Sequence, residues 1–265
     1  MMEKVDSANQ CFDFQGVGKL NSRRDDLSRN AVKRGIQSSK PRAVVLMSGG
    51  LDSCVTAAMA QPDHELFALH ASYGQRTESR EVESFNAQAD FFSVAERLDV
   101  NLDYMTRIGG SSLTDTNIAV PDQNLDNHDI PNTYVPFRNA HFLSIATSWA
   151  EVIGAKEIFI GAVWEDSSGY PDCRPEYFEA MNALIDAGTR PTTRITVRTP
   201  LIEMRKAQIV RKGFELGAPF ELTWSCYRNN TKACGTCDSC ALRLKSFSEA
   251  GLMDPVAYEE RPQHV

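Results

Sequence analysis

The run Ser48-Gly49-Gly50-Leu51-Asp52-Ser53 has the residue types of an anion-binding turn, and it follows a short apolar segment. Two adjacent glycines let a backbone turn tightly and approach a ligand, because they carry no Cβ. Asp52 or Ser53 is expected to cap a helix that begins here. The N-terminus of a helix presents free N–H groups and a positive dipole end, so the run predicts a cradle for an anion.

The run is not a P-loop of the Gly-x-x-x-x-Gly-Lys type, because no Lys follows the glycines. It is not a dinucleotide-binding fingerprint either, because that motif needs a third glycine. The run resembles the Ser-Gly-Gly-x-Asp-Ser pyrophosphate loop (PP-loop) of the ATP pyrophosphatase superfamily. That resemblance implies that ATP is split into AMP and pyrophosphate while an oxygen of the substrate is adenylated. The ATP-binding residues expected from it are Leu46, Met47, Ser48, Gly49, Gly50, Leu51, Asp52, Ser53, Cys54, Val55 and Thr56.

A second polar loop, Asp166–Pro175, collects carboxylate, guanidinium and thiol groups between two prolines. Asp166, Asp172 and Arg174 are candidate site residues, although Asp172 could instead cap a helix that starts near Pro175. Cys173 is a candidate nucleophile. No His lies nearby in the sequence, so covalent catalysis is not favoured.

Two further arginines are candidates, one after the second predicted strand and one at the start of a predicted helix. Arg76 lies in Tyr73–Arg76 and could meet a phosphate or carboxylate, although a solvated loop Arg is the better interpretation. Arg138 closes the long polar stretch 106–138, which is typical of a lid or a flexible segment. It is a candidate for stabilising phosphate charge, whereas Asn139 is expected to cap a helix.

Four of the seven cysteines cluster near the C-terminus. Cys226, Cys234, Cys237 and Cys240 form the pattern Cys-x7-Cys-x2-Cys-x2-Cys, which suits tetrahedral zinc. An iron–sulfur cluster uses similar spacing, but the Pro that often follows its last ligand is absent. The pattern therefore favours one structural zinc ion per chain, saturated by protein ligands.

These motifs need a parallel sheet that brings strand ends together. Apolar runs predict strands over 43–47, 66–71, 101–105, 157–161 and 194–198. Amphipathic or apolar runs predict helices over 53–60, 79–98, 140–153, 177–187 and 206–216. Alternating strands and helices indicate an α/β, doubly wound parallel sheet, in which ligands lie beyond the carboxyl ends of the strands.

The expected organisation is an extension over 1–40, a nucleotide-binding α/β domain over 41–217 and a small zinc-binding segment over 218–265. Hydrophobic residues make up 42% of the chain, as in ordinary globular proteins. The net charge is −7 although 1–42 is basic, so the body is acidic and argues against a broad nucleic-acid interface. No apolar run predicts a membrane span or a signal peptide, and clustered cysteines fit a reducing compartment, so a cytoplasmic location is expected.

Taken together, the motifs resemble the 7-cyano-7-deazaguanine synthase family of queuosine biosynthesis, over about residues 43–258. The matching blocks are Ser48–Ser53, Tyr73–Arg76, Tyr134–Asn139, Ser168–Pro175, Pro200-Leu201, Ser225–Tyr227 and Cys234–Cys240. The resemblance implies an adenine nucleotide alpha hydrolase-like fold and a ligase that forms C–N bonds. It also implies a homodimer, with 7-carboxy-7-deazaguanine, ammonia and ATP with Mg²⁺ as substrates.

In that chemistry the carboxylate is adenylated, ammonia gives an amide, and a second adenylation lets the amide become a nitrile. The leaving pyrophosphate would be held by Ser48, Gly49, Gly50, Asp52 and Ser53, and Arg138 would stabilise the adenylate. Asp166, Asp172 and Arg174 would orient the deazaguanine, because a carboxylate can accept adjacent N–H donors in pairs.

The chain departs from the family pattern at three positions, where Thr77, Phe137 and Ser167 stand. A relative that stops at the amide, or that adenylates tRNA, is therefore an alternative. A zinc-stabilised nucleotide-binding module without catalysis is a third, and it predicts ATP binding without pyrophosphate release.

Overall fold

The computed structural model describes residues 39–120, 130–164 and 169–261. Lys40–Val265 forms one compact unit. The predicted extension over 1–40 lies almost entirely outside the described residues. In the part of the chain that is described, no helix is both long enough and apolar enough to cross a membrane.

A five-stranded parallel sheet forms the centre of this unit, as the sequence predicts. Its strands are β1 (Arg42–Leu46), β2 (Glu65–Ser72), β3 (Glu96–Asn101), β4 (Glu157–Phe159) and β5 (Thr196–Arg198). Their order is β3-β2-β1-β4-β5, so the chain winds outward in both directions from β1. Ligands in such sheets bind at the reversal point, which lies between β1 and β4.

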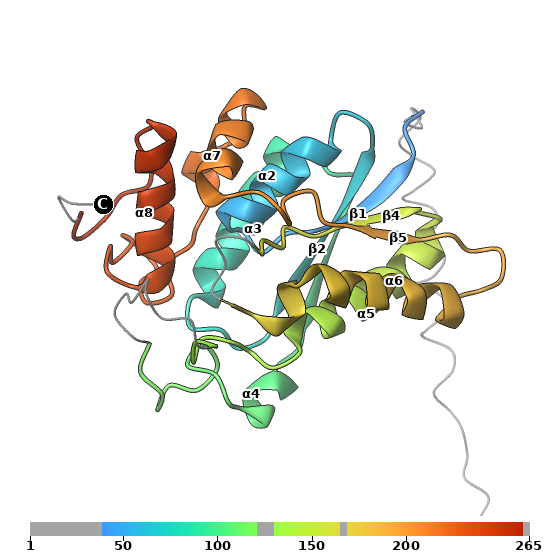
Figure 1. Cartoon of the computed structure of the whole chain (residues 1–265), viewed down its shortest axis with the longest axis horizontal. Helices are drawn as coiled ribbons and strands as arrows, with labels where there is room; N and C mark the ends of the chain where they lie inside the picture. The colour runs from blue at the N-terminus through green and yellow to red at the C-terminus, as the bar shows by residue number, and fades with distance from the viewer. Residues whose placement is uncertain (1–38, 121–129, 165–168, 262–265) are drawn as a thin grey trace, which may run out of the picture. The chain divides into compact units, whose positions relative to one another are not determined.

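Helices cover both faces of the sheet (Figure 1). The first face carries α2 (Leu51–Ala60), α3 (Glu78–Phe91) and α7 (Lys206–Glu215), and the second carries α5 (Arg138–Ile153) and α6 (Pro175–Gly188). The other helices in the described ranges are α4 (Tyr104–Ile108), the short η2 (Pro171–Cys173) and η3 (Phe220–Leu222), and α8 (Asp238–Ala250), which packs against α7.

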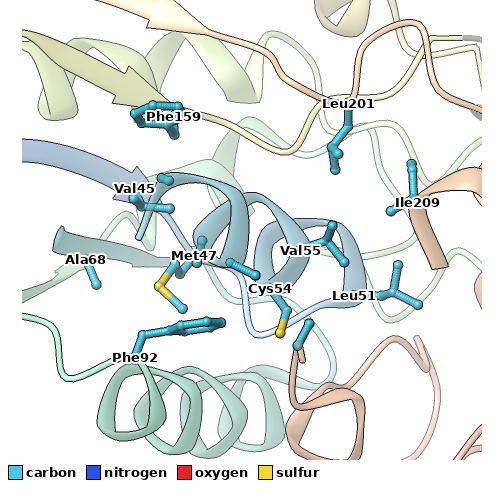
Figure 2. Packing of buried hydrophobic residues seen from close by; sticks show 14 of the residues in the cluster. Val45, Met47, Leu51, Cys54, Val55, Ala68, Phe92, Phe159, Leu201 and Ile209 are labelled. Carbon is cyan, nitrogen blue, oxygen red and sulfur yellow. The ribbon is translucent and has the colours of Figure 1, made fainter. Parts of the chain in front are cut away.

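The β1 strand is buried on both faces, which explains its uninterrupted apolar sequence. Val44 and Leu46 pack with α5 and α6, whereas Val45 packs with α2 and α3. Figure 2 shows Val45 of β1 and Cys54 and Val55 of α2 within the same buried cluster. Burying a side chain of this size stabilises the fold by about 1.5–3 kcal/mol, so β1 and the loop after it have a rigid base.

The third predicted strand was wrong. The chain leaves α3 at Phe91 and turns at Ser93, which has a φ of +52°, and β3 follows over Glu96–Asn101. The predicted strand 101–105 instead falls at the start of α4. Among the residues that the structure describes, β3 pairs only with β2. It is also largely exposed, so its polar sequence lacked the apolar run used to find the other strands.

Candidate active site

The PP-loop joins β1 to α2 with the strand–turn–helix form that the sequence predicts. Gly49 has a φ of +84°, and Gly50 is the N-cap of α2. The predicted cap by Asp52 or Ser53 was wrong. Ser53 Oγ donates to the Gly50 carbonyl at 3.0 Å, and the Asp52 carboxylate forms an ion pair with Lys206. No side chain in the described part of the chain caps α2, so its first-turn N–H groups suit an anion.

Two distant elements hold the Gly49 carbonyl. Gln88 Nε2 of α3 donates to it at 2.7 Å, and the Trp224 backbone N–H donates at 2.9 Å. A Cβ at Gly49 would lie 2.6 Å from the backbone oxygen of Glu81. Glycine is therefore required both by the backbone conformation and by the approach of α3.

The exit of β4 packs directly on the start of α2. A Cβ at Gly161 would lie 2.9 Å from the Asp52 carbonyl oxygen and from Thr56 Oγ1. This close approach brings the carboxyl ends of β1 and β4 around one crevice, as expected at the reversal point of the sheet.

A cavity of about 310 Å³ lies beyond these strand ends, which is within the size range of small-molecule sites. The predicted site residues that line it are Leu46, Met47, Ser48, Gly50, Leu51, Asp52, Ser53 and Arg138. Cys54, Val55 and Thr56 are buried inside α2 and are not among its lining residues. The cavity therefore joins the PP-loop to the N-terminus of α5.

Arg138 reaches the cavity from the first turn of α5. Its Nη1 donates to Tyr73 Oη at 2.9 Å, and its guanidinium carbon lies 5.5 Å from the centre of the Tyr73 ring. Burial raises the pKa of Tyr73 to about 12, so the phenol keeps its proton. The buried Nε of Arg138 has no hydrogen-bond partner among the described residues. An unpaired N–H on a permanent cation favours an anionic ligand group at this point.

Asp172 caps α5 from a neighbouring segment. Its Oδ2 accepts the Asn139 backbone N–H at 2.9 Å, while Asn139 Nδ2 donates to the Asp172 carbonyl at 2.9 Å. Burial raises the pKa of Asp172 above its ordinary value, although the bond from Asn139 and the charge of Arg138 oppose the rise. The predicted cap of the following helix was wrong, because Arg174 holds the N-cap position of α6. The expected cap by Asn139 was also wrong, since Phe137 is the N-cap of α5.

The other residues of this second polar loop are placed differently. Arg174 is exposed and lies 5.6 Å from the ring centre of Trp164, outside the cavity lining. Cys173 lines the cavity, and burial raises the pKa of its thiol to about 11. It is therefore a protonated thiol at neutral pH, which agrees with the interpretation against covalent catalysis. Asp166 lies outside the described residues.

Arg76 has a structural role in the loop after β2. Its guanidinium donates to the backbone carbonyls of Ser112, Asp115 and Ile118 at 2.7, 3.1 and 2.6 Å. The favoured interpretation of a solvated loop Arg was therefore wrong, because these carbonyls replace water, and Arg76 also lines the cavity. Arg76 fixes the beginning of the long segment that leads to Arg138.

Three charged cavity residues were not predicted from the sequence, namely Lys206, Glu81 and Arg243. Lys206 begins α7, and its Nζ lies 2.5 Å from Asp52 Oδ2 in the PP-loop. A cation in the first turn of a helix opposes the helix dipole, and this signal could have found it. Glu81 of α3 also lines the cavity. An acidic residue in the first turn of a helix is ordinary, so no local signal marked it.

Cys226, Cys234, Cys237 and Cys240 are brought together as predicted. All four are buried, and their sulfur atoms lie within 4.8 Å of one another. Cys226 Sγ accepts backbone N–H groups of Arg228, Asn229 and Cys234 at 3.3–3.4 Å. Four buried sulfurs at these distances fit a tetrahedral metal site in which the protein supplies every ligand.

A buried ion pair connects this cluster to the PP-loop. Arg243 of α8 binds Asp254 in bidentate fashion, with its Nε at 2.7 Å from Oδ2 and its Nη2 at 2.9 Å from Oδ1. The same guanidinium donates to Thr223 Oγ1 at 2.7 Å and Ser225 Oγ at 3.2 Å. Thr223 and Ser225 flank Trp224, whose backbone N–H donates to the Gly49 carbonyl. Arg243 of α8 therefore supports the PP-loop through the segment 223–225.

Comparison with known proteins agrees with this site. Residues 42–251 match the family described as Queuosine biosynthesis protein QueC. The 7-cyano-7-deazaguanine synthases of Chlorobium phaeobacteroides (strain DSM 266) and Chloroherpeton thalassium are 59% and 56% identical to the chain over 225 residues. These alignments cover 84% of this chain and all of each relative.

Solved structures give a more distant likeness. The NMN synthetase of Francisella tularensis aligns over 81% of this chain and 79% of its own, with a TM-score of 0.44 and 14% identity. This similarity is too low to add to the argument. The family match over most of the sequence is sufficient, and the chain belongs to the QueC family of queuosine biosynthesis proteins.

Proposed function

We propose that this enzyme converts 7-carboxy-7-deazaguanine and ammonia into 7-cyano-7-deazaguanine with consumption of ATP. Curated relatives that are 54–59% identical to the chain, and that align over almost their full length, carry the name of this activity. The structural observation that supports the proposal is the PP-loop, where uncapped N–H groups of α2 face a cavity that also contains Arg138.

The first step is adenylation of the substrate carboxylate. An oxygen of the carboxylate attacks the α-phosphorus of ATP, and pyrophosphate leaves with both electrons of the broken P–O bond. Ser48, Asp52, Ser53 and the first-turn N–H groups of α2 would hold the leaving pyrophosphate. Mg²⁺ bound with ATP would neutralise charge on the phosphates, and Asp52 is its natural carboxylate ligand.

Ammonia then attacks the acyl carbon, and AMP leaves to give the amide. A second ATP adenylates the amide oxygen, after which loss of AMP and of the remaining N–H protons produces the nitrile. Arg138 would stabilise negative charge on the acyl adenylate, since its buried Nε needs an acceptor.

The predicted roles of the second polar loop are revised in this proposal. Asp172 would act as a positioning residue, because it holds the first turn of α5 from which Arg138 extends. Arg174 would not contact the substrate directly, since it is exposed beside Trp164 and does not line the cavity. The assignment of Asp166 to the deazaguanine stays a prediction.

The cysteine cluster would hold one zinc ion with a structural role. Its four sulfurs leave no ligand position for a substrate, and the cluster lies on the segment that anchors Gly49. We also expect a homodimer in the cytoplasm that does not need nucleic acid. The acidic composition argues against the tRNA-dependent alternative.

Mass spectrometry of the product tests this function. We expect 7-cyano-7-deazaguanine, with AMP and pyrophosphate formed in the presence of the acid and ammonia. An amide as the final product would support the relative that stops at that stage. Consumption of ATP only in the presence of tRNA would contradict the proposal.

A further inference from the structure

Glu81 is a carboxylate in the cavity wall whose orientation is set by two neutral side chains. Thr77 Oγ1 donates to Glu81 Oε1 at 2.9 Å, and Gln75 Nε2 donates to Oε2 at 3.1 Å. All three residues line the cavity. A carboxylate offers about four acceptor positions, so one further position is available on each oxygen.

Glu81 differs from the other acidic residues near the site. Asp52 is paired with Lys206, and Asp172 accepts a backbone N–H and does not line the cavity. No Lys, Arg or His within the described ranges forms an ion pair with Glu81. Burial raises the pKa of Glu81, although the hydrogen bonds from Thr77 and Gln75 and the charges of His70 and Arg138 oppose the rise. The carboxylate therefore needs donors from a ligand to stabilise its charged form.

The arrangement of its free acceptor positions selects the type of ligand. One position on each oxygen suits two N–H donors on adjacent atoms of a flat edge, such as an N–H next to an amino group. The deazaguanine of the proposed substrate has this edge, whereas adenine presents an acceptor next to its amino group. A bound magnesium ion usually takes one carboxylate oxygen, and tetrahedral ammonium has no flat edge, so neither needs both oxygens held in one plane.

We propose that Glu81 is the specificity-determining residue that accepts the ring N–H and the 2-amino group of the deazaguanine. Thr77 and Gln75 hold its carboxylate in the required plane, and Arg138 lines the same cavity and would meet the acyl end. The inference rests on the proposed function, because it takes the substrate from it.

The test uses Glu81→Gln in the full-length enzyme, with release of pyrophosphate as the readout. Replacement of one carboxylate oxygen by an NH₂ group places a donor against a donor of the substrate. We expect the KM for the acid to rise about 10- to 100-fold, as for loss of one good bidentate contact. The KM values for ATP, Mg²⁺ and ammonium should stay within about twofold. Glu83→Gln on the exposed face of α3 is the matched control and should leave all four values unchanged.

A substrate analogue separates recognition from a structural role. The analogue lacks the 2-amino group, so its KM with the wild-type enzyme should be about 10-fold higher than that of the acid. With Glu81→Gln, the KM should differ much less between the analogue and the acid. If Glu81→Gln does not fold, the same comparison is made with Glu81→Asp, which keeps the charge but withdraws the carboxylate.

Three outcomes would overturn the inference. These are an unchanged KM for the acid, a raised KM confined to ammonium, and an altered requirement for Mg²⁺ alone. Failure of the wild-type enzyme to release pyrophosphate with the acid is a different result, because it would refute the proposed function before Glu81 is tested.

Discussion

Lys206 Nζ lies 2.5 Å from Asp52 Oδ2, and this contact joins the first turn of α7 to the PP-loop across 154 residues of sequence. Both side chains line the cavity beside the first turn of α2. A cation is therefore held at the point where the α2 N–H groups would meet phosphate. Its place suits neutralisation of charge on a leaving pyrophosphate.

Replacement of Lys206 should slow adenylation. We expect Lys206→Met to lower kcat for pyrophosphate release by about 100-fold, which is typical for loss of one charge-stabilising donor. The exposed Lys245, which pairs with Glu249 on α8, gives the control Lys245→Met with unchanged kcat. A normal kcat in Lys206→Met would show that the lysine serves only to hold Asp52.

Gly49 should not tolerate a side chain. Gly49→Ala places a methyl group 2.6 Å from the Glu81 carbonyl oxygen at a φ of +84°. We expect the free energy of unfolding to fall by about 1–3 kcal/mol and the affinity for ATP to fall with it. Urea denaturation and nucleotide titration measure the two effects. Gly188→Ala at the end of α6, where a Cβ would meet nothing within 4 Å, should be neutral, and equal behaviour of the two variants would refute the steric argument.

The Arg243–Asp254 pair should dominate the stability of the C-terminal segment. Asp254→Asn leaves a buried guanidinium without its counter-charge, and we expect a loss of about 3–5 kcal/mol in the free energy of unfolding. The control is Asp90→Asn, which alters an exposed pair with Arg97 and should cost less than about 1 kcal/mol.

The same pair gives a pH dependence with a defined sign. Burial alone would raise the pKa of Asp254, but the hydrogen bonds and charge of Arg243 outweigh it and hold the pKa below its ordinary value. The folded state therefore favours the ionised form, and its stabilisation is present above the ordinary pKa of about 3.9. We expect the stability difference between wild type and Asp254→Asn to be constant from about pH 5 to 7 and to shrink below about pH 4. A difference that grows on acidification would contradict this assignment.

Removal of the metal should loosen the PP-loop as well as the C-terminal segment. Trp224, which holds Gly49, precedes the first ligand Cys226 by two residues. We expect chelation or Cys226→Ser to lower the melting temperature and weaken ATP binding. Elemental analysis should give one zinc per chain in wild type and in the control Cys54→Ala, whose thiol lies in the core. Iron in place of zinc, or full ATP affinity without metal, would contradict the structural zinc site.

The parts of this site that were predictable from sequence are those whose signal is local. The PP-loop combines a buried strand, two glycines and a helix start within about ten residues, and the cysteines Cys226–Cys240 lie within one short segment. Their residue types restrict the geometry by themselves, because glycine conformation and thiolate coordination leave few alternatives. The fold confirms the strand–turn–helix form of the PP-loop and the grouping of the four cysteine sulfur atoms.

The parts that were missed depend on tertiary contacts. Lys206 is significant because α7 packs beside α2, and Glu81 because the start of α3 faces the cavity. Asp172 had the sequence features of a cap for the next helix, yet it caps α5, whose first turn precedes it by more than 30 residues. Side-chain roles of this kind follow from which elements become neighbours, and a single sequence carries little information on that.

The central claim is that ATP is cleaved between its α- and β-phosphates by an oxygen of the substrate carboxylate. It is tested most directly with 7-carboxy-7-deazaguanine labelled with ¹⁸O in the carboxylate, in the presence of ATP and ammonia. Adenylation predicts that one labelled oxygen appears in the phosphate of AMP, with unlabelled pyrophosphate as the other product. Label in inorganic phosphate together with ADP, or unlabelled AMP, would contradict the claim.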